Sequence, residues 1–124
     1  LVLLAPGNFH MELIRSGTKY HVSLNQKPTL YGVRPAVDHL FNSVAKAAGA
    51  HALGLILTGM GRDGAAGLLQ MKNAGSYNIA QNEASCVVFG MPKEAIALGA
   101  IHTVLSVEKI ARSLENHFKQ KKVS

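Results

Sequence analysis

A histidine and an aspartate follow two separate apolar runs of this chain, each after a corner that contains glycine. His10 follows the run at residues 1–4 and the corner Pro6-Gly7, and Asp63 lies in a glycine-rich corner after the run at residues 52–57. Both runs are predicted to be buried strands, and open α/β sheets place their chemistry at the carboxyl ends of parallel strands. An imidazole and a carboxylate at that edge form a candidate catalytic pair that still needs a nucleophile.

The serines do not supply an obvious nucleophile. None of them lies in a G-x-S-x-G turn, the strand-to-helix corner that exposes a catalytic serine. Ser85, in a predicted loop at the end of a strand, is the best candidate within the chain. A metal centre is not expected either, because Cys86 is the only cysteine and no two of the six histidines are spaced i, i+4.

The glycine corner admits other interpretations. Residues 59–64 match G-x-G-x-x-G between a predicted strand and a predicted helix, with Glu83 near the position of a ribose-binding acid, which is the pattern of a dinucleotide site. Asp63 argues against that site because its carboxylate would repel a pyrophosphate at the start of the helix. The glycines could instead serve close helix–strand packing, and Asp63 could cap a helix.

The composition is that of one ordinary globular domain. The 124 residues are 48% hydrophobic and 16% charged, and no apolar run approaches the ~20 residues of a membrane span, so no membrane insertion is expected. The net charge of +6 is scattered or lies in the C-terminal lysines, without a basic stripe interleaved with aromatics. This pattern predicts no specific nucleic-acid binding but allows attraction to an acidic protein. A single cysteine fits a reducing cytoplasm.

The hydrophobic pattern predicts an α/β fold with a mostly parallel, doubly wound sheet and one β-hairpin. The hairpin is expected from residues 12–15 and 19–24 around Ser16-Gly17-Thr18, and Ser106 is expected to cap the last helix. Further strands are predicted at residues 52–57, 77–81 and 101–105, and helices at residues 37–48, 65–74, 92–99 and 107–118. Residues 1–118 are predicted to be the C-terminal part of a larger domain, and residues 119–124 a basic tail.

Four stretches of the sequence together resemble one family. They are Ala-Pro-Gly-Asn-Phe-His-Met (residues 5–11), Val-Arg-Pro-Ala-Val-Asp-His-Leu-Phe (33–41), Leu-Thr-Gly-Met-Gly-Arg-Asp-Gly-Ala-Ala-Gly (57–67) and Ala-Gln-Asn-Glu-Ala-Ser-Cys-Val-Val-Phe-Gly-Met-Pro (80–92). In this order they resemble the catalytic domain of the chemotaxis protein-glutamate methylesterase, CheB. The similarity runs along nearly the whole chain.

The resemblance implies a Ser-His-Asp esterase that needs no cofactor. His10 and Asp63 match the family's catalytic histidine and aspartate, and Met60 matches the methionine whose main-chain N–H belongs to the oxyanion hole. The family's serine lies in a glycine-rich turn before the first motif, outside this chain. The implied partners are methylated chemoreceptor helices in the cytoplasm, whose acidic surface Arg62 could favour, and a receiver domain in the same protein. A non-catalytic module that binds receptors or a receiver domain is the alternative.

Overall fold

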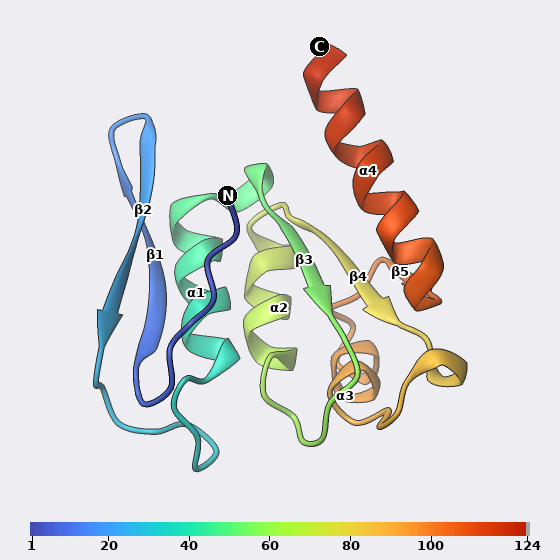
Figure 1. The fold of residues 1–124 in the computed structure, drawn as a ribbon, viewed down its shortest axis with the longest axis horizontal. Helices are drawn as coiled ribbons and strands as arrows, with labels where there is room; N and C mark the ends of the chain where they lie inside the picture. The colour runs from blue at the N-terminus through green and yellow to red at the C-terminus, as the bar shows by residue number, and fades with distance from the viewer. Residues whose placement is uncertain (124) are drawn as a thin grey trace.

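A three-stranded parallel sheet forms the centre of the fold (Figure 1). The computed structural model describes residues 1–123. The strands lie in the order β3-β4-β5, with bounds Leu53–Ile56, Tyr77–Gln81 and Thr103–Leu105. Each parallel neighbour is reached through a helical crossover, because parallel strands cannot be joined by a tight turn. The predicted α/β class and parallel sheet are therefore confirmed.

The helices agree with the sequence pattern to within a few residues. Their bounds are α1 Val37–Ala47, α2 Ala65–Asn73, α3 Met91–Ala97 and α4 Val107–Val123, with short 3-10 turns η1 at Gly49–His51 and η2 at Glu83–Ser85. Ser106 caps α4 as expected, since its Oγ accepts the Lys109 N–H at 3.4 Å. Helix α4 continues beyond residue 118 to Val123, while the division into domain and basic tail stays a prediction.

Both faces of the central strand β4 are covered. Its residues 78–81 are all buried, although neighbouring side chains on a strand point to opposite faces. Helices α2 and α3 lie against one face of the sheet. On this face Gly54 of β3 lets Leu68 of α2 come close, because a Cβ on Gly54 would lie only 2.6 Å from a Leu68 methyl carbon. Helix α4 contacts β4 and β5 as well. This arrangement explains why β4 is the most buried strand.

The β-hairpin stands apart from the parallel sheet, on the other side of α1 (Figure 1). Strands β1 (His10–Ser16) and β2 (Lys19–Asn25) are antiparallel, and the pair Ser16–Lys19 closes the turn at Gly17-Thr18. Gly17 has a φ of 63°, which glycine adopts without the strain that a Cβ would cause. The predicted hairpin is confirmed, and it extends further than expected, so that His10 becomes the first residue of β1.

The strand predicted at residues 1–4 is not present. No described strand pairs with this segment, and the side chains of Leu1, Val2, Leu3 and Leu4 are 52–112% exposed. An apolar run becomes a strand only when neighbouring strands satisfy its N–H and C=O groups, and the described part of the chain offers none here. His10 is therefore positioned by the hairpin and by α1 rather than by a preceding strand.

Candidate active site

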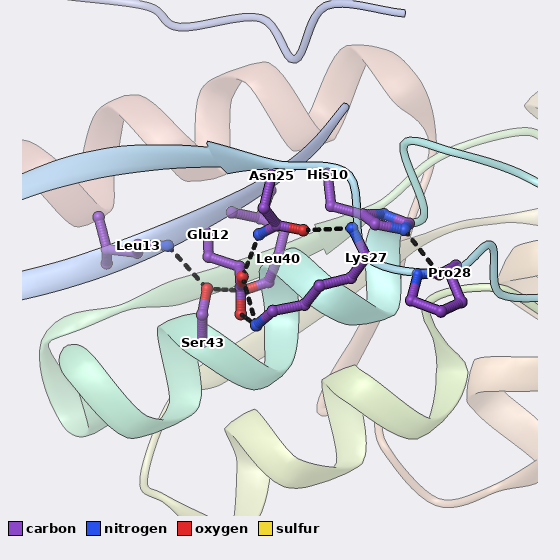
Figure 2. A network of polar contacts seen from close by, with 8 residues as sticks. All are labelled: His10, Glu12, Leu13, Asn25, Lys27, Pro28, Leu40 and Ser43. Atoms are coloured by element: carbon purple, nitrogen blue, oxygen red, sulfur yellow. Dashed lines mark hydrogen bonds and ion pairs between the residues drawn. The ribbon is translucent and has the colours of Figure 1, made fainter. Parts of the chain in front are cut away.

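His10 is completely buried, and main-chain groups meet both of its ring nitrogens. Its Nδ1 accepts the N–H of Ala36, just before α1, at 3.1 Å. Because Nδ1 is an acceptor, the neutral ring carries its proton on Nε2, which donates to the Pro28 carbonyl at 3.0 Å (Figure 2). The contacts therefore fix one tautomer of the ring, the Nε2–H form.

Asp63 is held by the next two N–H groups of the same helix start. Its Oδ2 accepts the Val37 N–H at 2.7 Å, and its Oδ1 accepts the Asp38 N–H at 2.9 Å. A carboxylate at this position satisfies N–H groups that have no partner within the helix and lies at the positive end of its dipole. Asp63 thus caps α1, a helix distant in sequence, whereas Gly64, with a φ of 102°, stands at the N-cap of α2.

The structure brings His10 and Asp63 to one helix start without joining them directly. We expected a hydrogen bond between the imidazole and the carboxylate, and the described hydrogen bonds include none between these two residues. Successive N–H groups of residues 36–38 bind the two side chains instead. The ring nitrogen that contacts this helix start is Nδ1. In a Ser-His-Asp triad, the aspartate accepts a hydrogen bond from this nitrogen when it carries the proton.

Asp38 makes the reciprocal connection, from α1 to α2. Its Oδ1 accepts the N–H groups of Gly64 at 3.0 Å and Gly67 at 2.8 Å, and its Oδ2 accepts the Tyr31 hydroxyl at 2.8 Å. That last hydrogen bond is the main reason why the pKa of Tyr31 is raised above its ordinary value. The Arg62 guanidinium lies 4.9 Å from the centre of the Tyr31 ring. Arg62 is exposed, with the Tyr31 ring as its aromatic neighbour.

The anion-binding end of α2 is already filled by Asp38. A dinucleotide fingerprint would present its helix-start N–H groups to a pyrophosphate, yet two of these groups here donate to a carboxylate. The N–H of Gly59 is also engaged, by the Val88 carbonyl at 3.0 Å, and Glu83 is exposed in η2. These contacts weigh against the nucleotide-binding interpretation.

Two loops at the carboxyl ends of β3 and β4 are joined closely. The Thr58 Oγ accepts the N–H groups of Val87 and Val88 at 3.0 and 2.9 Å, and the Gly59 carbonyl accepts the N–H of Gly90 at 3.1 Å. Met60 projects from this junction with 86% of its side chain exposed. Among the described residues no acceptor meets its main-chain N–H, which fits a donor reserved for a substrate oxygen.

The Ser85 hydroxyl takes part in hydrogen bonds that hold neighbouring segments together. Its hydroxyl donates to the Asn82 Oδ1 at 2.6 Å and accepts the Gln81 Nε2 and the Val107 N–H at 3.2 Å each. No imidazole is among these partners, so nothing in the described surroundings takes up its proton. The one internal candidate for a nucleophile therefore connects the ends of β4 and α4 instead.

A polar clamp supports the loop that carries Pro28 (Figure 2). The polar clamp consists of Glu12, Asn25 and Lys27. The Glu12 carboxylate accepts hydrogen bonds from the Asn25 amide and from the Lys27 ammonium, the latter at 3.1 Å. The Asn25 Oδ1 accepts the main-chain N–H of Lys27 at 3.1 Å. Partial burial raises the pKa of Glu12, but the hydrogen bond and charge of Lys27, with smaller contributions from Asn25 and His39, outweigh it and lower that pKa overall. The clamp ends one residue before the carbonyl that holds His10.

The described residues contain neither a cluster of metal ligands nor a membrane-spanning helix. No three histidine, cysteine, aspartate or glutamate side chains of residues 1–123 are grouped as a metal ion would require. No helix in that part of the chain is both long and apolar enough to cross a membrane.

Comparison with known proteins decides the family. The family model described as CheB methylesterase matches residues 1–114. The chain belongs to the CheB methylesterase family. It is 60% identical over 113 residues to a protein-glutamate methylesterase/protein-glutamine glutaminase of Bdellovibrio bacteriovorus and 58% identical over 115 residues to the protein of that name in Thiobacillus denitrificans. These alignments cover 91% and 93% of this chain but 32% of each relative, so the chain spans about a third of their length.

The fold of this CheB-family chain agrees with a solved structure. The crystal structure of the Thermotoga maritima CheB methylesterase catalytic domain matches with a TM-score of 0.86 and 39% identity, over 89% of this chain and 58% of that one. The family resemblance read from the four motifs is thereby confirmed. Sequence reasoning singled out His10 and Asp63, whose catalytic roles stay predictions. It did not single out Ala36, Pro28 and Asp38, because no local pattern reveals main-chain partners that are 18–29 positions away.

Proposed function

We propose that this chain is the histidine- and aspartate-bearing part of a protein-glutamate methylesterase, and that a serine from a preceding segment completes its catalytic site. The reaction is hydrolysis of γ-glutamyl methyl esters on chemoreceptor cytoplasmic helices, with release of methanol, and deamidation of specific glutamines is the related activity. The names of the relatives and the family match over residues 1–114 support this assignment.

His10 is the proposed general base. It takes the proton of the serine hydroxyl as the oxygen attacks the ester carbonyl, and later returns that proton to the departing methoxide. For this role Nε2 must be free of hydrogen, so the proton that it donates to Pro28 has to move to Nδ1. Once it carries a proton, Nδ1 can no longer accept the Ala36 N–H. It donates instead to the carboxylate of Asp63, which is bound to the next N–H groups at the start of α1.

Asp63 and Met60 have complementary electrostatic roles. The Asp63 carboxylate would fix the Nδ1–H tautomer and stabilise the imidazolium that forms in the transition state. The free N–H of Met60 would donate to the tetrahedral oxyanion, a contribution of ~3 kcal/mol for one such donor. These steps need neither a metal nor an organic cofactor.

The proposed setting is the cytoplasm, and the proposed partners are methylated receptor helices and a receiver domain of the same protein. Arg62 and the net charge of +6 would favour the acidic surface of a receptor. The observation that carries the proposal is the common anchorage of His10 and Asp63 on residues 36–38 within a family-matched chain. A non-catalytic receptor-binding module would have no use for the buried imidazole of His10.

The decisive experiment measures methanol release from methylated receptor membranes. The chain preceded by the proposed serine segment should release methanol, and His10→Ala in that protein should abolish the release while its circular dichroism spectrum is unchanged. Residues 1–124 alone should bind receptor membranes without releasing methanol. Equal turnover in the wild type and in His10→Ala would contradict the proposal and favour a different base.

A further inference from the structure

A second imidazole lies against the face of His10. The rings of His10 and His39, the latter in the first turn of α1, have their centroids 3.9 Å apart and are tilted by 42°. The Nε2 of His39 is buried, and among the described residues it has no hydrogen-bond partner. His39 is thus a titratable group in contact with the proposed base, and the reaction as described above makes no use of it.

The other contacts of His10 leave one motion of its ring unrestrained. The Pro28 carbonyl and the Ala36 N–H meet the two nitrogens at the edges of the ring. A ring held at two edges can still tilt about the line that joins them. The face contact with His39 blocks this tilt, because the imidazole of His10 would have to move into the neighbouring ring.

We propose that His39 is a positioning residue for His10, which holds the plane of the proposed catalytic imidazole through contact between the two rings. This inference rests on the proposed function of His10 as the base. It adds a residue that the four family motifs do not single out for chemistry.

Packing alone would not require an imidazole at this position. A buried nitrogen without a partner destabilises a fold, whereas a phenylalanine or leucine would fill the space without an unpaired polar atom. The ring of His39 matters here through its position, because its centroid lies 3.9 Å from that of His10 and its plane faces the imidazole.

The charged groups around this pair come from several elements. Glu12 projects from β1 and its carboxylate interacts with His39 through charge, while Lys27, after β2, neutralises that carboxylate in the polar clamp. Asp63 lies in the loop before α2, and Asp38 precedes His39 on α1 itself. Both aspartates accept main-chain N–H groups, and no described carboxylate accepts a hydrogen bond from the buried Nε2 of His39.

The test uses three variants of the protein that includes the proposed serine segment. His39→Ala removes both ring and charge, His39→Phe keeps a ring without a charge, and His51→Ala, at an exposed residue of η1, is the matched control. We expect kcat to fall by about tenfold or more in His39→Ala, because small misplacements of a catalytic group have effects of this size. His39→Phe should keep most of kcat, because its ring still covers the face of His10. His51→Ala should change neither.

A spectroscopic measurement makes the inference independent of turnover. Nitrogen-15 NMR of the His10 ring should report a single neutral tautomer in the wild type and in His39→Phe, and a mixture of tautomers in His39→Ala. If these signals behave as expected while no variant releases methanol, His39 positions His10 and the proposed function fails. Wild-type kcat and an unchanged tautomer of His10 in His39→Ala would overturn the inference.

Discussion

His10 and Asp63, 53 positions apart in the sequence, are bound by successive N–H groups at the start of α1. The N–H of Ala36 meets the imidazole, and those of Val37 and Asp38 meet the carboxylate. The helix start therefore fixes the imidazole and the carboxylate by main-chain groups, which substitution of side chains cannot remove. Because Asp63 both caps α1 and is the proposed partner of His10, a change at Asp63 should affect helix capping and catalysis together.

Replacement of Asp63 by asparagine should separate these two roles. The amide oxygen of Asn can still accept one N–H of α1, so we expect a loss of unfolding free energy of about 1 kcal/mol, typical of a weakened cap. Catalysis in the protein with its serine segment should fall much further, up to about 10⁴ in kcat, because an amide cannot stabilise the imidazolium. Urea unfolding and methanol release measure the two effects, and a loss of activity below about tenfold would make Asp63 a helix cap only.

Ser85→Ala should weaken the fold and leave the chemistry unchanged. The hydroxyl connects Asn82, Gln81 and Val107, so its removal deletes three hydrogen bonds. The Ser85 main chain still binds Gln81 and Asn82, so the unfolding free energy should fall by about 1 kcal/mol. The kcat for methanol release should stay within the error of the wild type. Ser16→Ala, at the exposed last residue of β1, is the control for stability. A Ser85→Ala protein that folds normally but has lost turnover would identify Ser85 as the nucleophile.

Gly67→Ala should disrupt the contact between α1 and α2. A Cβ on Gly67 would lie 2.6 Å from the Phe41 Cβ and 2.8 Å from the Asp38 Oδ1. Neither atom can move freely, because Asp38 accepts N–H groups of α2 and Phe41 is packed in the core. We expect a loss of about 1–3 kcal/mol, as for other overpacked cores. Gly7→Ala, where the added Cβ has open space, should change the thermal midpoint little.

The polar clamp predicts a pH dependence of stability. The pKa of Glu12 in the folded protein lies below its ordinary value, so its interaction with Lys27 stabilises the fold above that ordinary pKa and is lost as the pH falls through the folded pKa. Glu12→Gln should therefore be less stable than the wild type at neutral pH, with the difference shrinking in acid. Paired urea titrations at neutral and at acidic pH measure it. A difference that is constant across this range would exclude the carboxylate charge as its source.

The sequence predicted most of the secondary structure because the periodicities are local. Strand β4 was predicted with its observed bounds, and the hairpin turn at Gly17 was recognised from its residue types. The prediction of a strand at residues 1–4 was wrong because strand formation depends on neighbouring strands that an apolar run cannot reveal. Likewise the motifs singled out His10 and Asp63 as candidate residues, whereas the exchange of caps between Asp38 and Asp63 depends on helix packing across 25–29 positions.

The glycine loop provides a last prediction, which concerns nucleotides. NAD, FAD and ATP should show no saturable binding below millimolar concentration, since the N–H groups of Gly64 and Gly67 already hold the carboxylate of Asp38 and Asp63 adds a second negative charge nearby. Two unit charges ~5 Å apart repel by roughly 3 kcal/mol at an effective dielectric near 20, which weakens binding more than a hundredfold. Isothermal titration of the chain with each nucleotide measures this. Micromolar binding that strengthens in Asp63→Ala and is competed by pyrophosphate would instead make residues 59–64 a phosphate-binding loop, and the carboxylate of Asp38 would then have to leave the start of α2.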